Sequence, residues 1–309
     1  MKYSLTLVLA FVVFCAPASA ASSEKVPILV IPKGERVQYW RWMKQGALDA
    51  GRDRRVEIIY RGPRISDDYQ AQLDIIQIGI DDKVDAIVLA PSHAFRAKAL
   101  LEKAKHNGIV VILIDSDMEF EGRTSFVASD NFGAGQRAAK HLLSLIGHKG
   151  SVLLMRYKQD NASTAARENG FLDVFRKEAK GGEVIDSGYI GVSVGNAYHR
   201  TLEIMKEHQD VKAIFSPGEA TTVGCLKALD ALGLAGKIKV VGFDYTDEIH
   251  RALKEQKIHG VVLQRPYRMG YFGVMTACDA LEGKPVDKRV VTDVIIATDV
   301  ADIPTLTLP

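Results

Sequence analysis

The chain has 309 residues, of which 47% are hydrophobic and 25% are charged, a composition that excludes an intrinsically disordered chain and a coiled coil. Its formal net charge of +2 is too small and too dispersed for the clustered basic face that nucleic-acid binding needs, so we expect no nucleic-acid partner. The length fits two α/β domains of ordinary size.

The first twenty residues predict a secretory signal peptide. Lys2 supplies a positive start, an apolar run extends from Leu5 to Ala16, and Ala18-Ser19-Ala20 supply small residues for cleavage near Ala20. The apolar run is shorter than the about 20 residues that span a bilayer. We therefore expect an exported, periplasmic protein that loses residues 1–20 and is not embedded in the membrane.

Beyond the signal peptide, short β-branched runs alternate with amphipathic helical stretches almost to the end of the chain. This alternation predicts parallel sheets with helices on both faces. The expected strands are 28–31, 56–59, 86–89, 110–114, 152–155, 184–186, 213–215, 240–243 and 260–263, and the expected helices include 39–50, 71–80, 94–107, 134–146, 170–179, 222–232 and 269–281.

The alternation falls into two series, which predicts two Rossmann-like lobes. The first series ends near Ile114, and the polar stretch from Asp115 to Arg123 is a candidate boundary. Neither series needs the helix from Pro266 to Leu281, so we expect it to return to the first lobe and the chain to cross between lobes more than once. The expected lobes are 21–129 plus 265–292 and 130–264 plus 293–309.

Candidate site residues follow the expected strands, because ligands of open α/β sheets bind outside the carboxyl ends of the strands. These positions are 33–40, 91–93, Asp115, Ser116, 157–167, 216–219, Asp244 and Gln264.

Seven stretches, in order along the chain, resemble the ribose-binding-protein type of periplasmic sugar-binding protein, a substrate-binding component of ABC transporters. They are Val84–Pro91 (VDAIVLAP), Gly108–Ser116 (GIVVILIDS), Ser125–Asn131 (SFVASDN), Ala162–Phe171 (ASTAARENGF), Pro217–Gly224 (PGEATTVG), Val240–Asp244 (VVGFD) and Gln264–Gly270 (QRPYRMG). The resemblance implies the type I periplasmic binding protein fold, in which three hinge strands join two lobes that close on one small ligand.

The resemblance also implies functional positions. Tyr39 and Trp40 match an aromatic pair ahead of the first helix, whose rings can pack on the C–H face of a sugar. The other matches can form charge-assisted or neutral hydrogen bonds to hydroxyls. They are Asp115 at the end of the fourth strand, Arg167 before a Gly-Phe pair, Asp244 of the Gly-Phe-Asp turn and Gln264 at a hinge; the neighbouring Ser116, Gly218 and Glu219 complete the candidate ligand-binding set.

Simpler roles stay open for these side chains at this point. Tyr39 and Trp40 could be half-buried residues at a helix start, and Asp115 and Asp244 could cap helices or stabilise the hinge. Arg167 could be a solvated helix residue. Gln264 could pair with hinge backbone.

Three departures from the ribose-binding pattern bear on the ligand. Val37 and Gly218 stand where ribose binders have asparagine, and Ser116 stands where they have arginine. A buried hydroxyl without its partner costs about 1–3 kcal/mol, so we do not expect ribose itself. Glu35, Arg36 and Glu219 lie beside these positions and could supply other partners, which leaves another monosaccharide, a sugar acid or a polyol.

The function expected from this resemblance is capture of a small polar ligand for an ABC permease, by a monomer without metal or cofactor. A receptor for a sensor kinase or chemoreceptor is the alternative with the same fold. A transcription regulator would need an N-terminal helix-turn-helix where the signal peptide stands. The motifs of serine hydrolases and zinc proteases are absent from the sequence, so we expect no enzyme.

Overall fold

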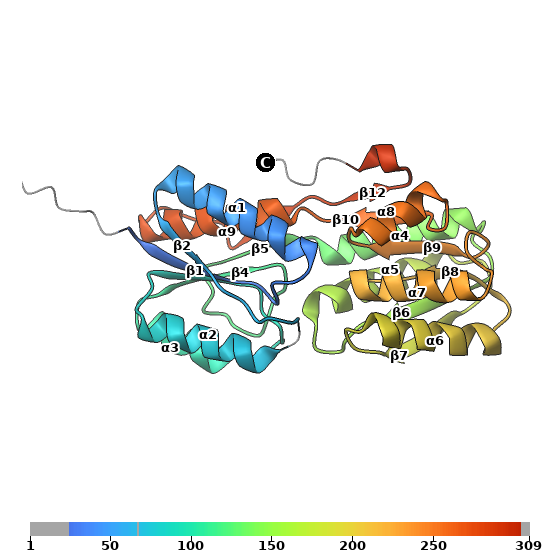
Figure 1. Cartoon of the computed structure of the whole chain (residues 1–309), viewed down its shortest axis with the longest axis horizontal. Coiled ribbons are helices and arrows are strands. Elements are labelled where there is room, and N and C mark those ends of the chain that lie inside the picture. The colour runs from blue at the N-terminus through green and yellow to red at the C-terminus, as the bar shows by residue number, and fades with distance from the viewer. Residues whose placement is uncertain (1–24, 67, 304–309) are drawn as a thin grey trace, which may run out of the picture.

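The computed structural model describes residues 25–66 and 68–303 as two α/β lobes that lie side by side (Figure 1). The predicted signal peptide, residues 1–20, lies outside the described residues. Each lobe contains one six-stranded sheet. Among the described helices, none combines the length and apolar character needed to cross a membrane.

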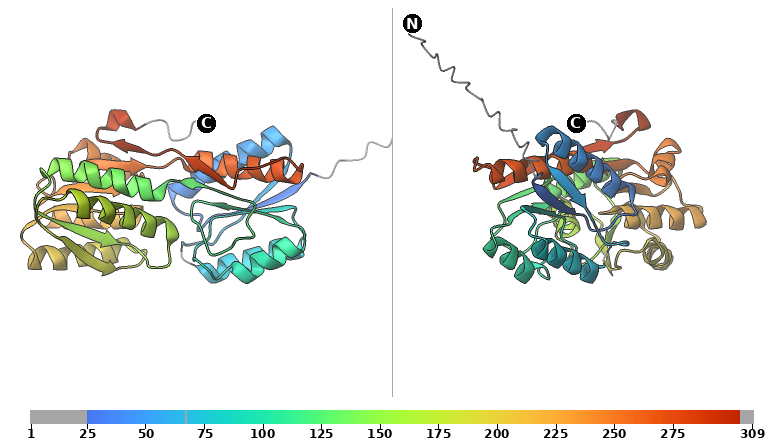
Figure 2. Two further views of the ribbon diagram at one scale, coloured as in Figure 1. Left: turned by 180° about the vertical axis from the view of Figure 1, so that it is seen from behind. Right: turned by 60° about the vertical axis from the view of Figure 1, so that its left-hand side comes forward.

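The sheet of the first lobe has the strand order β11-β5-β4-β3-β1-β2, and all its paired strands are parallel. Helices α1 (Gln38–Arg54) and α9 (Pro266–Leu281) cover one face, and α2 (Tyr69–Asp81) and α3 (Lys98–His106) cover the other (Figures 1 and 2). The strands are β1 (Pro27–Ile31), β2 (Glu57–Tyr60), β3 (Ala86–Leu89), β4 (Val110–Ile114), β5 (Ser125–Ser129) and β11 (Arg289–Thr292).

The second lobe repeats this arrangement with the strand order β12-β10-β9-β8-β6-β7. Helices α4 (Asn131–Leu145) and α5 (Ala162–Glu178) cover one face, and α6 (Val194–Glu207), α7 (Glu219–Ala231) and α8 (Asp247–Lys254) cover the other. The strands are β6 (Ser151–Arg156), β7 (Val184–Tyr189), β8 (Val211–Phe215), β9 (Lys239–Phe243), β10 (Gly260–Leu263) and β12 (Ile295–Ala297), of which β12 pairs antiparallel to β10.

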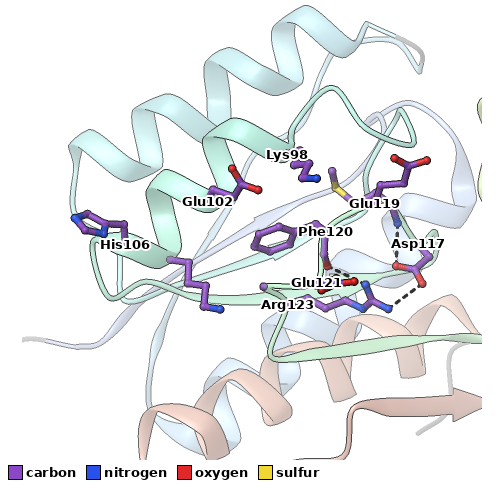
Figure 3. A pocket seen from close by; sticks show the side chains of 11 residues that line it. Lys98, Glu102, His106, Asp117, Glu119, Phe120, Glu121 and Arg123 are labelled. Carbon is purple, nitrogen blue, oxygen red and sulfur yellow. Dashed lines mark hydrogen bonds and ion pairs between the residues drawn. The ribbon is translucent and has the colours of Figure 1, made fainter.

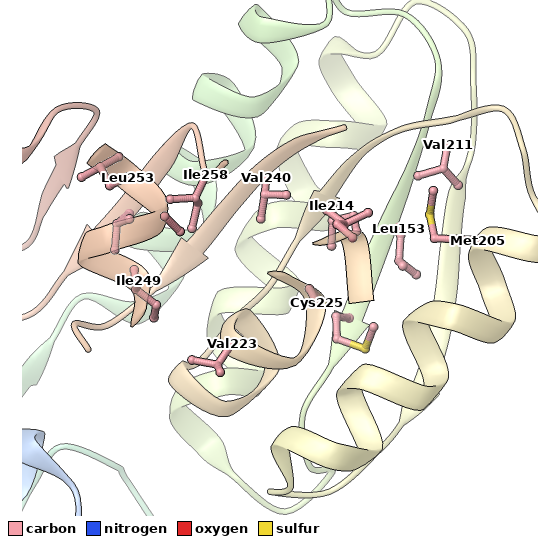
Figure 4. Close-up of a cluster of buried hydrophobic side chains, with 14 of the residues drawn as sticks. Leu153, Met205, Val211, Ile214, Val223, Cys225, Val240, Ile249, Leu253 and Ile258 are labelled. Carbon is pink, nitrogen blue, oxygen red and sulfur yellow. The ribbon is translucent and has the colours of Figure 1, made fainter. Parts of the chain in front are cut away.

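The central strands of both sheets are mostly apolar because helices cover both faces of each sheet. In β1, Leu29 and Ile31 pack with α2 and α3, whereas Ile28 and Val30 pack with α1 and α9. The second lobe follows the same rule, and Figure 4 shows Leu153, Ile214 and Val240 of its strands on one side of the sheet. Burying each such side chain contributes about 1.5–3 kcal/mol, so these four packed layers supply the main stabilisation of the lobes.

The prediction of two α/β lobes with mainly parallel sheets is confirmed, but two details of the sequence interpretation are wrong. The candidate boundary at 115–123 lies within the first lobe, because β5 follows it and pairs with β4. The expected strands also omit β11 and β12, each of which adds an edge strand to one sheet. The strand β5 was missed because its buried ends are Ser125 and Ser129, which interrupt the apolar pattern.

The chain passes between the two sheets at three places. These are the connections from β5 to α4, from β10 to α9 and from β11 to β12. Each connection is short, and Asp130 at the first of them caps α4 by accepting a hydrogen bond from the Gly133 N–H (3.0 Å). Three short connections allow the lobes to rotate about a common hinge without separating.

The close packing of α1 against α9 leads to a stability prediction. A Cβ atom on Gly46 would lie 2.0 Å from the carbonyl oxygen of Tyr267, which only movement of the helix backbone could relieve. We therefore expect Gly46→Ala to lower the free energy of unfolding by about 2 kcal/mol or more, measured by urea denaturation.

The matched control is Gly195→Ala in the first turn of α6, where the new Cβ would meet only the Ser193 hydroxyl at 3.5 Å. This variant is expected to be as stable as the parent or slightly more stable. Equal stability of the two variants would show that the α1–α9 contact tolerates a side chain.

Candidate ligand-binding site

A cavity of about 160 Å³ lies between the lobes, where the carboxyl ends of strands from both sheets face each other. Pockets for drug-sized ligands are roughly 300–1,000 Å³, so this cavity suits a smaller molecule. Eight of the nine sequence-predicted residues line it: Tyr39, Trp40, Asp115, Arg167, Gly218, Glu219, Asp244 and Gln264.

The two predicted aspartates occupy equivalent positions in the two lobes. Asp115 follows β4, and Asp244 follows β9, which is the fourth strand of the second series. Their φ angles are 63° and 69°, and their backbone N–H groups donate to Val127 O and Val262 O at 3.0 Å each. Aspartate tolerates this left-handed backbone better than most residues. The shared local conformation presents one carboxylate from each sheet toward the cavity.

Asp115 is held as a carboxylate by two neighbours. Lys33 Nζ lies 2.6 Å from one carboxylate oxygen, and the Tyr39 hydroxyl donates to the other at 2.8 Å. Burial opposes ionisation of Asp115, but the Lys33 ammonium, the two hydrogen bonds and Arg167 outweigh it and lower the pKa of this carboxyl. Burial and the nearby acids raise the pKa of Tyr39 well above its ordinary value. The Tyr39 hydroxyl therefore stays protonated as a donor.

Arg167 is a buried cation on α5, with only 3% of its surface exposed. Its Nε donates to Asn131 Oδ1 (2.8 Å), its Nη1 donates to the Pro217 carbonyl (2.9 Å), and its guanidinium lies 4.4 Å from the centre of the Phe243 ring. The same Nη1 is 3.9 Å from Asp244 Oδ2. These contacts fix the plane of the guanidinium and leave it facing the acid of its own lobe.

Gln264 connects the two acids through the hinge. Its Nε2 donates to Asp244 Oδ1 at 2.6 Å, and its Oε1 lies 3.5 Å from the Tyr39 hydroxyl that binds Asp115. Burial raises the pKa of Asp244, and Arg167 and Gln264 offset this effect only in part. The simpler reading of Gln264 as a partner of hinge backbone does not match these side-chain contacts.

The aromatic pair forms one wall of the cavity. Tyr39 and Trp40 lie in the first turn of α1, with ring centroids 4.9 Å apart and an angle of 83° between the planes. Both rings are almost fully buried against the first lobe. The edge-to-face contact fixes the Trp40 ring, which is the arrangement needed for a flat apolar platform.

Ser116 is the one predicted residue that does not line the cavity. Its hydroxyl accepts a hydrogen bond from Lys33 Nζ (2.6 Å) and lies 3.0 Å from Ser163 Oγ of the second lobe. Glu35 and Arg36 do not line the cavity either, and Glu35 instead accepts a hydrogen bond from the Gly62 N–H (2.9 Å). Of the three residues proposed to replace missing ribose contacts, the structure brings only Glu219 to the cavity.

Sequence reasoning did not single out several residues that line the cavity. Lys33 follows β1, and Asn161, Ser163 and Thr164 stand at the start of α5. All four fall within the stretches after strands, so their positions were foreseen. Their contacts could not be predicted in the same way. Asn161, for example, is both the N-cap of α5 and a residue that lines the cavity.

The lobes touch each other at two places near the cavity. His93 Nε2 of the first lobe lies 2.7 Å from Asp160 Oδ2 of the second. On α1, the Trp42 ring lies 5.6 Å from that of Tyr245, and Trp42 packs against the core of the second lobe. The structure therefore shows the lobes closed over the cavity.

A larger pocket of about 1050 Å³ lies on the flank of the first lobe, beside α3 (Figure 3). Its lining comes from one lobe, and its charged side chains, such as Glu102 and Glu119, are exposed. Asp117 and Arg123 pair with each other there at 3.2 Å. Without a convergent set of buried polar groups, this pocket lacks the features of a specific site.

Among residues 25–66 and 68–303, no group of three or more His, Cys, Asp and Glu side chains is arranged to hold a metal ion.

Comparison with known proteins gives consistent matches. A family model described as a periplasmic binding protein domain matches residues 28–285. The D-ribose/D-allose-binding protein of Pseudomonas aeruginosa is 26% identical over 275 residues, which cover 86% of this chain and 85% of the relative.

Two solved structures have the same fold over nearly the whole chain. The periplasmic component of an ABC-type sugar transport system from Hahella chejuensis is 33% identical with a TM-score of 0.84, covering 87% of this chain and 99% of that chain. An ABC transporter solute-binding protein from Agrobacterium vitis with bound D-fucose is 30% identical with a TM-score of 0.82, covering 88% of this chain and 95% of that chain.

Proposed function

The chain belongs to the periplasmic binding protein family, and from that premise we propose that it captures one monosaccharide between its lobes and delivers it to an ABC permease. The family places the protein in the periplasm and makes it a binding protein rather than an enzyme. The names of its relatives support a sugar, because they include ribose, allose and D-fucose binders.

The observation that carries the proposal is the composition of the cavity wall. Asp115, Lys33 and Trp40 come from the first lobe, whereas Arg167 and Asp244 come from the second. A ligand can contact both sets only when the lobes are closed, so it stabilises the closed form. The permease can then recognise closure as the sign of a loaded protein.

In this proposal six of the nine predicted residues have a defined part. The carboxylates of Asp115 and Asp244 accept hydrogen bonds from sugar hydroxyls, and Arg167 donates to them. Trp40, held by Tyr39, packs against the C–H face of the ring. Ser116 acts indirectly, because it holds Lys33 and reaches Ser163 across the cleft.

We further propose the domain division expected from the sequence, together with a monomeric protein whose residues 1–20 are removed on export. The presence of β5 and β11 in the first sheet and of β12 in the second supports lobes of 21–129 plus 265–292 and 130–264 plus 293–309. Val37 and Gly218 line the cavity without the amides of ribose binders, which supports a monosaccharide other than ribose.

A thermal-shift screen of the protein against monosaccharides, sugar acids and polyols tests the proposal. At 100 times its dissociation constant a ligand adds about 2.7 kcal/mol of stability, which raises the melting temperature of a protein of this size by roughly 5–10 °C. We expect one sugar to give such a shift and to bind with one-to-one stoichiometry by calorimetry. The absence of any shift across the three classes would reject sugar capture.

A further inference from the structure

The charges that line the cavity do not balance. Two cations, Lys33 and Arg167, and three acids, Asp115, Glu219 and Asp244, line it within the described part of the chain. Lys33 lies 2.6 Å from Asp115, and Arg167 lies 3.9 Å from Asp244. Each cation is thus already beside one acid of its own lobe. Glu219 is the carboxylate that is left over.

Glu219 is the first residue of α7 and follows Gly218, the N-cap. Its side chain is half-buried, and no described side chain forms an ion pair or hydrogen bond with its carboxylate. The charged groups that face it are themselves acids, Asp244 at the end of β9 and Glu248 on α8, and Glu248 is paired with Lys227 (3.1 Å). In the described part of the chain, no positive charge is therefore paired with Glu219 itself.

This environment makes the ionised form of Glu219 unfavourable. Burial, followed by the negative charges of Asp244 and Glu248, raises the pKa of Glu219 to about 7. The N-terminus of α7 stabilises a negative charge, but this stabilisation is smaller than the free energy that burying the carboxylate costs. A cation placed in the cavity beside Glu219 would stabilise its ionised carboxylate, as Lys33 stabilises that of Asp115.

We propose that Glu219 selects an amino sugar, whose ammonium group lies against this carboxylate in the closed cavity. The inference rests on the proposed function, because it takes the ligand to be a sugar. An ammonium group supplies the third positive charge that three acids require. A sugar acid would add a further negative charge beside Glu219 and Asp244, so this class is disfavoured.

The test is calorimetric titration of the protein at pH about 7 with neutral monosaccharides and with their amino-deoxy counterparts, including glucosamine, galactosamine and mannosamine. We expect an amino sugar to bind about tenfold or more tightly than its neutral parent. In Glu219→Gln, which keeps the size of the side chain, this preference should disappear while the neutral parent still binds. Unfolding curves of the variant verify that α7 is intact.

Glu248→Gln is the matched control, because it removes a neighbouring charge that lies outside the cavity and is paired with Lys227. Glu248→Gln should keep the preference for the amino sugar over its neutral parent. The amino-sugar affinity of the parent protein should also fall as the pH is lowered through about 7, since protonated Glu219 no longer attracts a cation.

Two results would overturn the inference while leaving sugar capture intact. These are a neutral sugar that binds as tightly as every amino counterpart, or a preference that persists in Glu219→Gln. No binding of any sugar, neutral or charged, would reject the proposed function itself.

Discussion

Replacing Asp244 with asparagine is expected to weaken ligand binding by at least about 30-fold, because a buried, hydrogen-bonded charge at a binding site contributes roughly 2–5 kcal/mol. Asp244 accepts a 2.6 Å hydrogen bond from Gln264 and faces Arg167 at 3.9 Å. When residue 244 is uncharged, the sugar hydroxyl and Arg167 both lose the carboxylate that they share. Isothermal titration calorimetry with the sugar found in the screen measures the loss.

Asparagine is the appropriate substitution because the backbone φ of residue 244 is 69°, a conformation that asparagine adopts more easily than alanine. The control is Asp230→Asn on α7, since Asp230 is exposed and pairs with the surface residue Lys257. The control should bind normally. Unchanged affinity in Asp244→Asn would remove this residue from the site.

Arg167→Ala is expected to have the second large effect, on stability and on binding together. Its guanidinium is 3% exposed and bonds to Asn131 and to the Pro217 carbonyl. Removing it leaves Asp244 buried without a cation, which costs roughly 3–5 kcal/mol of unfolding free energy. Urea denaturation measures this loss, and calorimetry should detect no binding.

Arg176→Ala on the same helix is the matched control, because Arg176 is exposed. Its stability should change by less than about 0.5 kcal/mol. If Arg167→Ala loses stability but keeps its affinity for the sugar, then Arg167 only supports Asp244 and does not contact the ligand.

The fold could be predicted largely because its core strands are apolar on both faces. Runs such as that of β3 are fully buried, and nothing in their composition competes with a strand assignment. The edge strand β11 escaped prediction because two of its four residues are exposed and its ends are polar, and β12 escaped because it is only three residues long. Their partners lie far away along the chain, in β5 and β10, so no local pattern indicates the pairing.

The site was predictable as far as it depends on strand ends. Asp115 and Asp244 could be placed because an acid directly follows an apolar run in each lobe. What the sequence could not provide is the relation between the lobes. The pairing of Lys33 with Asp115, the link from Ser116 to Ser163 and the isolation of Glu219 all depend on which side chains meet after the chain has folded.

The return of α9 to the first lobe has a consequence for the order in which the protein can fold. Five of the six strands of the second sheet lie in one continuous segment, from β6 to β10, so that lobe can assemble soon after it has been synthesised. The first lobe is synthesised earlier, yet the sheet face beside α1 stays partly uncovered until residues 266–281 arrive. The first lobe, although it is begun earlier, therefore stays incomplete until after the continuous part of the second lobe has been synthesised.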